Sequence, residues 1–211
     1  EQATSETKIS RSKGAGGLAE LIETEGGETL RFFLLRTHYR STIVYGPETL
    51  EESRTALESF RRFFERYQRI AGEDFYDLTP TANRSEGDFN PGDEPLLQEV
   101  VKRRTAYLAK MDDDFNTGAA ISELFELLRA LNKYIDQNQL EDAAARNADH
   151  LSVLRRGVAT LRELTALLGL FREPPEQKSA KDDHLTSQLL DFLVELRTES
   201  RKRKDFATAD Q

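Results

Sequence analysis

Apolar residues recur along most of this chain at intervals of three, four and seven positions, the spacing that places side chains on one face of an α-helix. The clearest run spans residues 48–71. Pro47 stands directly before it, where a helix start tolerates proline, and Gly72 stands directly after it. Its apolar face consists of Leu50, Leu57, Phe60, Phe64 and Tyr67. The pattern therefore predicts a long amphipathic helix.

Four further runs with the same spacing follow. The first begins near Pro95 and has an apolar side of Leu97, Val100, Val101, Leu108 and Met111. The second carries Ile121, Leu124, Phe125, Leu128, Leu131 and Ile135, and the third carries Leu151, Leu154, Val158, Leu161, Thr165 and Leu168. The fourth carries Leu185, Leu189, Phe192, Leu193 and Leu196 and continues into Arg201-Lys202-Arg203-Lys204. Because no alternating strand pattern accompanies these runs, we expect an all-α fold, an antiparallel helical bundle.

The segments between these runs are richer in polar residues, glycine and proline. We interpret residues 1–17 as a flexible loop, and residues 18–35 as a short helical connection interrupted at Gly26-Gly27. Residues 73–95 contain three prolines and several Asp, Asn and Ser residues, which predicts a linker or long loop. Pro174-Pro175 break the chain again after the run that carries Leu151 to Leu168.

Charge and cysteine content narrow the classes of function. The net charge is −8, so a nucleic-acid site must be a local basic patch on an acidic body. The absence of cysteine excludes disulfides and thiolate metal sites. No apolar run approaches the roughly 20 residues of a membrane span, and no signal-peptide pattern occurs. The chain starts at Glu1 without a methionine and stops at Gln211 shortly after a helix-like run, so we expect both ends to be cut rather than natural.

Three basic clusters are candidate phosphate contacts: Lys102-Arg103-Arg104, Arg155-Arg156 and Arg201-Lys202-Arg203-Lys204. Clusters of this kind also occur on solvated helix faces. For the first two clusters both interpretations stay open, whereas for the third we favour contact with RNA.

The histidines form no pattern typical of a metal site. His38, His150 and His184 lie far apart, and none has the spacing of a metal ligand. We expect His150 and His184 at the surface.

Asp112-Asp113-Asp114 has two interpretations. Three adjacent carboxylates are typical ligands of Mg²⁺, but acidic residues before a helix start also favour its positive end. We favour the second interpretation, because Asn116 or Thr117 can cap a helix that begins there. The sequence therefore predicts no metal site in this chain.

The first loop carries one chemical signal, Lys8-Ile9-Ser10-Arg11-Ser12, which resembles the KMSKS signature of class I aminoacyl-tRNA synthetases. Adenylyl transfer builds negative charge on the leaving pyrophosphate, and cations on a mobile loop stabilise that charge in the transition state. Hydroxyls and backbone N–H groups add hydrogen bonds to phosphate. Ile9 replaces the signature's methionine. Arg11 replaces its second lysine, which keeps the charge but changes the donor geometry.

Three longer segments place this loop in a wider context. Leu30-Arg31-Phe32-Phe33-Leu34-Leu35-Arg36-Thr37-His38-Tyr39-Arg40-Ser41 resembles the segment LRYFLLSGHYRS of the cysteinyl-tRNA synthetases. Asp112-Asp113-Asp114-Phe115-Asn116-Thr117 matches that family unchanged, although Gly118 follows where a proline is usual and predicts a looser helix start. Lys204-Asp205-Phe206-Ala207-Thr208-Ala209-Asp210 resembles its KDFALAD run. The chain thus resembles the C-terminal half of a cysteinyl-tRNA synthetase.

The resemblance implies a domain organisation and a reaction. Residues 1–45 correspond to the KMSKS-like loop and the end of the class I catalytic region, residues 46–173 to a DALR-type helical bundle, and residues 174–211 to a truncated anticodon-binding region. The family consists of cytoplasmic, usually monomeric ligases that join cysteine to its tRNA with ATP and Mg²⁺. Its HIGH motif and zinc-bound cysteine pocket precede the loop. We therefore expect zinc only in that part, and this segment alone to be inactive.

The same resemblance assigns expected roles to individual residues. Lys8 and Arg11 are the expected catalytic cations, and Lys8, Ser10, Arg11 and Ser12 are the expected ATP contacts. The expected tRNA contacts are Arg201, Lys202, Arg203, Lys204 and Phe206. Arg203 and Phe206 are candidate platforms for unstacked anticodon bases.

Two alternatives stay open. A small-molecule cysteine ligase of the mycothiol pathway shares the loop and the HYRS segment but lacks an anticodon region, and the long helical continuation to Gln211 argues against it. A non-catalytic helical interaction module would carry the loop by chance.

Overall fold

The computed structural model describes residues 18–175, and every regular element within that range is a helix. Six α-helices follow one another: α1 (Leu18–Glu25), α2 (Gly27–Leu35), α3 (Pro47–Ala71), α4 (Pro95–Asp112), α5 (Thr117–Gln137) and α6 (Ala148–Leu167). Short 3-10 turns lie at Phe75–Asp77, Arg84–Gly87 and Ala143–Ala145. The predicted all-α bundle is confirmed for this part of the chain, and the predicted helix from Leu185 lies outside it.

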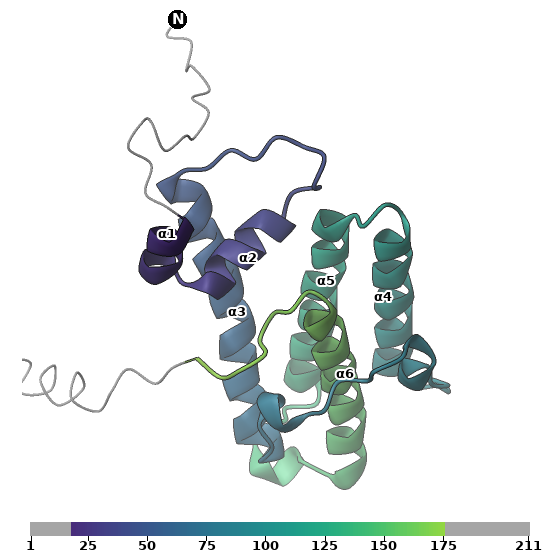
Figure 1. Cartoon of the computed structure of the whole chain (residues 1–211). Coiled ribbons are helices and arrows are strands. Elements are labelled where there is room, and N and C mark those ends of the chain that lie inside the picture. The colour runs from purple at the N-terminus through teal and green to yellow at the C-terminus, as the bar shows by residue number, and fades with distance from the viewer. Residues whose placement is uncertain (1–17, 176–211) are drawn as a thin grey trace, which may run out of the picture. The chain divides into compact units, whose positions relative to one another are not determined.

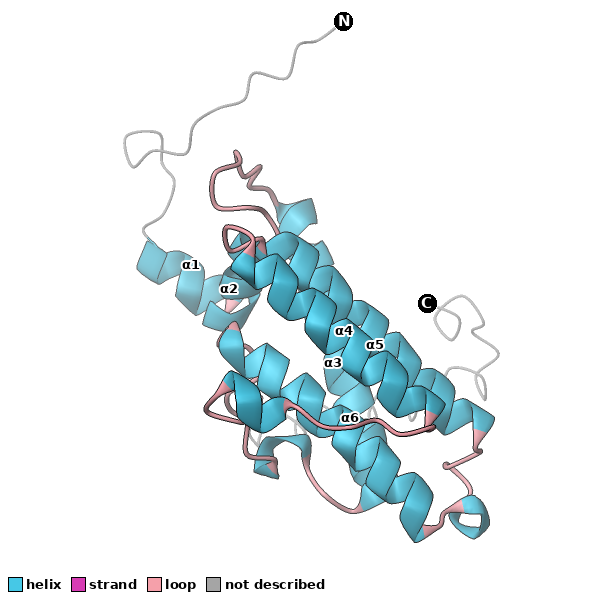
Figure 2. Ribbon diagram, turned by 90° about the vertical axis from the view of Figure 1, so that its right-hand side faces the viewer, coloured by secondary structure: helices cyan, strands magenta, loops and turns pink. Residues whose placement is uncertain are grey.

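The long helices pack side by side (Figures 1 and 2). A tight turn joins α4 to α5, and these two antiparallel helices share the most extensive contact in the bundle. α6 packs against both of them, while α2 lies across α3. The described helices belong to one unit that ends at Arg172. The predicted domain boundaries after residues 45 and 173 stay predictions.

The sequence signals for helix ends have visible consequences. Gly26 has a φ of 81°, a left-handed conformation that suits glycine, and it separates α1 from α2. Asn116 caps α5 by accepting a hydrogen bond from the Ala119 backbone N–H at 3.2 Å. Pro95 occupies the first turn of α4, where its missing N–H leaves no helical bond unmade.

The core is rich in aromatic side chains. Phe64 of α3 stacks on Phe75 with ring centroids 3.7 Å apart, and Phe171 lies edge-on to Phe64 at 4.9 Å. Phe75 and Phe171 belong to connections rather than to long helices, yet both are fully buried. In the segment 73–95, predicted as a linker or long loop, Phe75 and Leu78 therefore pack into the core, whereas residues 79–95 are exposed or half-buried.

The buried face of α4 agrees with the predicted one only in part, since Val100 and Leu108 are buried as predicted. Leu96, Val100 and Tyr107 are the deeply buried residues, whereas Leu97 and Val101 are only half-buried. The helix is turned so that the Tyr107 hydroxyl donates to the Leu164 carbonyl of α6 at 3.0 Å. Apolar spacing alone did not reveal this, because a polar tip decides where tyrosine sits.

None of the described helices combines the length and the hydropathy needed to cross a membrane.

Candidate site at the motif-bearing end of the bundle

The residues predicted to contact ATP and tRNA lie outside the described part of the chain. They are Lys8, Ser10, Arg11 and Ser12 in the first loop, and Arg201, Lys202, Arg203, Lys204 and Phe206 near the C-terminal end. Their roles stay predictions. The described residues do include the two other motifs, His38-Tyr39-Arg40-Ser41 and Asp112 to Thr117.

These two motifs meet in the structure, although about 75 residues separate them. The Tyr39 hydroxyl donates to Asp114 Oδ1 at 2.8 Å, and an Arg40 Nη2–H donates to the same oxygen at 3.3 Å. His38 Nε2 lies 3.8 Å from Asp114 Oδ2. One carboxylate thus faces three consecutive side chains of the other motif.

Contacts within the His38–Arg40 segment tighten this arrangement. Arg40 Nε donates to the Tyr39 hydroxyl at 2.8 Å, and the guanidinium lies 5.3 Å from the centre of the Tyr39 ring. The His38 ring stacks on that ring at 4.8 Å. The hydrogen bond to Asp114 raises the pKa of Tyr39, because ionising the hydroxyl would break it beside a carboxylate. The Tyr39 hydroxyl is thus both a donor to Asp114 and an acceptor from Arg40.

The turn that supplies Asp114 has an uncommon backbone. Asp114 and Phe115 have φ values of 54° and 51°, so two consecutive non-glycine residues are left-handed. Such a conformation costs on the order of 1 kcal/mol or more at each residue. It turns the Asp114 carboxylate toward Tyr39 and leaves Phe115 67% exposed.

Gly118 lies in the first turn of α5 and permits this turn to approach the backbone of Arg36 closely. A Cβ atom at this position would lie 2.6 Å from the backbone oxygen of Arg36. The expected loosening of the helix start misses this packing role, which depends on a neighbour more than 80 residues away in sequence. The first turn of α5 thus lies directly against the end of α2.

Two carboxylates of the Asp112-Asp113-Asp114 motif have different partners. Arg84 Nη1 donates to Asp112 at 2.8 Å, while Asp114 faces Arg40 and His38. No group of three or more His, Asp or Glu side chains suited to a metal ion occurs among residues 18–175. Asn116, and not a carboxylate, makes the side-chain cap of α5.

The first basic cluster lies close to carboxylates, and one of its three side chains is buried. Arg104 is 5% exposed and binds Glu163 of α6, while Arg103 bonds Glu99 at 2.6 Å and Glu123 at 3.1 Å. Lys102 lies 3.4 Å from Glu99. The phosphate interpretation of this cluster is wrong for Arg104, because a buried guanidinium cannot reach RNA.

The second basic cluster is divided. Arg155 makes two bonds of 2.9 Å to the Glu73 carboxylate, which lower the pKa of Glu73. The guanidinium of Arg156 lies 4.4 Å from the centre of the Phe89 ring. Both arginines are exposed, so Arg156 keeps its charge available at the surface.

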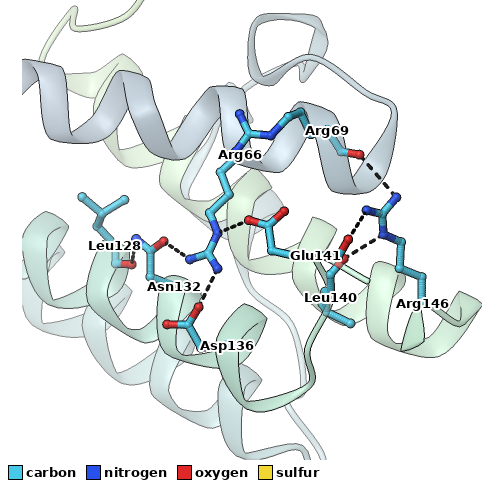
Figure 3. A network of polar contacts seen from close by, with 8 residues as sticks. All are labelled: Arg66, Arg69, Leu128, Asn132, Asp136, Leu140, Glu141 and Arg146. Carbon is cyan, nitrogen blue, oxygen red and sulfur yellow. Dashed lines mark hydrogen bonds and ion pairs between the residues drawn. The ribbon is translucent and has the colours of Figure 1, made fainter. Parts of the chain in front are cut away.

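Other arginines join helices together (Figure 3). Arg66 of α3 binds Asn132 at 2.7 Å and Glu141 at 2.8 Å, and it also pairs with Asp136. Arg146 donates to backbone carbonyls of Leu140, Glu141 and Arg69, as the dashed lines of Figure 3 indicate. Arg66 and Arg146 therefore fasten α3 to α5 and its following turn.

The two histidines of the described part, His38 and His150, do not converge. His150 is half-buried and lies edge-on to Tyr134 with ring centroids 6.1 Å apart, so the expectation of a surface position holds only in part. Its Nδ1 has no hydrogen-bond partner. His184 lies outside the described residues, and only His38 joins the motif contact.

Known proteins resemble this chain over nearly its whole length. The chain is 31% identical over 205 residues to the cysteine–tRNA ligase of Bacillus licheniformis and 34% identical over 206 residues to that of Pasteurella multocida. These alignments cover 97% and 96% of this chain but 38% and 37% of the relatives. The chain thus spans about two fifths of their length. A DALR domain matches residues 106–172, which contain α5, α6 and the acidic motif.

Proposed function

We propose that this chain, whose resemblance to the C-terminal part of cysteine–tRNA ligases is confirmed over nearly its whole length, works as that part of such a ligase. The carrying observation is the continuous similarity across 96–97% of the chain, which includes both motifs that meet at Asp114. The complete reaction would activate cysteine with ATP and transfer it to cysteine tRNA. We expect it to take place in the cytoplasm.

In this proposal the first loop acts on ATP. Lys8 and Arg11 stabilise the charge that develops on pyrophosphate, and Ser10 and Ser12 add hydrogen bonds to the phosphates. Mg²⁺ accompanies the ATP. Zinc belongs to the cysteine pocket that precedes this loop in the family. We therefore expect the 211-residue chain alone to form no cysteinyl-adenylate.

The helical part would hold the tRNA. The described helices use many of their arginines in ion pairs, which supports assigning phosphate contacts to Arg201, Lys202, Arg203 and Lys204. Phe206 would stack on an unpaired base. We expect one chain to bind one tRNA as a monomer.

Binding to transcribed cysteine tRNA over a salt series tests the proposal, with the same tRNA carrying an altered anticodon as the comparison. We expect salt-sensitive binding that weakens with the altered anticodon, because the tail would contact both phosphates and bases. Equal, salt-sensitive binding to both RNAs would restrict the chain to phosphate contacts. Absence of binding at low salt would contradict the role as an RNA-binding unit.

The two alternatives predict different outcomes. A small-molecule cysteine ligase or a helical protein-interaction module would bind neither RNA with a salt-dependent affinity. The DALR domain and the cysteine–tRNA ligases that align across the chain favour the tRNA proposal over both.

A further inference from the structure

We propose that Asp114 is a positioning residue that fixes the His38–Arg40 segment on the α4–α5 turn, and that Tyr39 and Arg40, held in this way, form a contact surface for the tRNA. This inference rests on the proposed function and adds to it a second RNA contact, far in sequence from the basic tail. The observation that carries it is the convergence of Tyr39 and Arg40 on a single carboxylate oxygen.

The first argument concerns the backbone of the turn. Glycine would adopt the left-handed conformation of residue 114 without strain, yet an aspartate stands there. Its carboxylate accepts from Tyr39 and Arg40, and glycine would lose both bonds. Strain retained at one residue in favour of its side chain is typical of a site that fixes another group.

The second argument concerns what remains free after these bonds are made. The Arg40 side chain is 68% exposed, and Tyr39 is 59% exposed. Arg40 uses Nε toward Tyr39 and Nη2 toward Asp114, so its remaining N–H donors can bind a phosphate while the cluster stays intact. The segment therefore presents a preordered cation beside an aromatic ring, a combination that suits a nucleic-acid strand.

The third argument concerns local charge. Two of the three motif carboxylates already face cations, since Asp112 pairs with Arg84 and Asp114 pairs with Arg40. Of the three, Asp113 alone makes no ion pair within residues 18–175. The turn thus presents much less negative charge to a phosphate than its sequence indicates.

Two glycine substitutions separate the carboxylate from the backbone. Asp114→Gly removes the carboxylate and relieves the left-handed strain at residue 114. Phe115→Gly relieves the corresponding strain at residue 115 and keeps the Asp114 carboxylate. Trypsin can cleave after each of the 30 lysines and arginines, so the fragments are identified by mass spectrometry. The rate of cleavage after Arg36 and Arg40 under native conditions then reports local opening of this segment. We expect faster cleavage in Asp114→Gly and unchanged cleavage in Phe115→Gly.

Binding of cysteine tRNA by the full chain then tests the RNA contact. Removing a negative charge would by itself strengthen binding to RNA, and Asp113→Ala serves as the control for that effect. Loss of the positioning by Asp114 would instead weaken binding to RNA. We expect Asp114→Gly to weaken binding about tenfold, Asp113→Ala to leave it equal or tighter, and Asp114→Asn to restore part of the loss because its amide oxygen still accepts.

A double-mutant cycle shows whether Asp114 acts through Arg40. Arg40→Ala alone should weaken binding by a similar factor, and adding Asp114→Gly should cause little further loss. Full additivity, or Asp114→Gly binding as tightly as Asp113→Ala, would overturn the RNA contact. Unchanged tryptic cleavage in Asp114→Gly would overturn the positioning role.

The outcomes distinguish this inference from the proposed function. If the unmodified chain binds no tRNA, the proposed function and the RNA contact both fail, while the cleavage rates still decide the positioning role. If the chain binds tRNA and Arg40→Ala binds equally well, the RNA contact alone fails.

Discussion

The guanidinium of Arg104 and the carboxylate of Glu163 form a bidentate ion pair in the interior, with bonds of 2.9 Å from Nε to Oε2 and 2.7 Å from Nη2 to Oε1. Both side chains are 6% exposed. Arg104 also binds Asp88 and the backbone oxygen of Arg84, each at 2.6 Å. One side chain of α4 therefore fastens α6 and the loop before α4.

Removal of the carboxylate should destabilise the fold strongly. Glu163→Ala leaves the buried Arg104 charge with only Asp88 as an anionic partner, and we expect a loss of about 3 kcal/mol in the free energy of unfolding. Urea denaturation measures this loss. The control is Glu126→Ala, which breaks the surface pair with Arg129 and should cost less than about 0.5 kcal/mol. Equal losses in both variants would mean that the interior pair contributes no more than a surface pair.

Gly118 should not tolerate a methyl group. In Gly118→Ala the new Cβ would lie 2.6 Å from the Arg36 backbone oxygen, so either α2 or the start of α5 must move. We expect destabilisation of about 1–3 kcal/mol, measured by thermal or urea unfolding. Gly27→Ala is the matched control, because its Cβ would meet only Ile22 at an ordinary 3.9 Å. A stable Gly118→Ala variant with an unshifted α2 would contradict the close approach.

Alkaline pH should weaken the fold partly through Tyr76. Burial, followed by the nearby Glu28 carboxylate, raises the pKa of Tyr76 to about 12, compared with an unfolded value of 10.0. The stability from this group is complete below pH 10 and is lost as pH rises from 10 through about 12, because the unfolded chain releases its proton first. Tyr76→Phe should therefore flatten the decline in that window.

The measurement for Tyr76 is urea unfolding at pH 8, 10 and 11. At pH 8 both folded and unfolded tyrosine are protonated, so the difference between the two proteins there sets the reference. A difference that stays constant from pH 8 to 11 would show that Tyr76 ionises alike in both states.

The basic tail should determine the salt dependence of RNA binding. Replacing Arg201, Lys202, Arg203 and Lys204 by alanine should lower the slope of log affinity against log salt by up to about 3, close to 0.7–0.9 per phosphate contact. The control removes the same charge from four exposed arginines outside the proposed RNA contacts: Arg54, Arg62, Arg69 and Arg129. A similar slope change in both variants would mean that the salt dependence reflects net charge and not contacts made by the tail.

The helices themselves were predictable from the chain. Apolar spacing indicated α3 to α6. Pro47, Gly72 and Pro95 marked three of their ends, and Asn116 or Thr117 was expected as a cap. These features are local, because a helix face and its cap are decided by residues within a few positions. The resemblance to cysteinyl-tRNA synthetases was likewise legible in short, ordered motifs.

The partners of individual side chains were not predictable in this way. Arg104 looked equivalent to Lys102 and Arg103, and Phe75 stood in what resembled a linker, yet both are buried. The meeting of Tyr39 with Asp114 had no local signal either, since it depends on how α2 and the α4–α5 turn come together.

The sequence by itself therefore determined the helical class, several helix ends and the family to which the chain is similar. Only the tertiary structure decided which charges are free for a ligand. Burial and ion pairing depend on neighbours brought together by packing, and Arg104 with Glu163, 59 residues apart, shows that a charge's position in the chain does not reveal its surroundings.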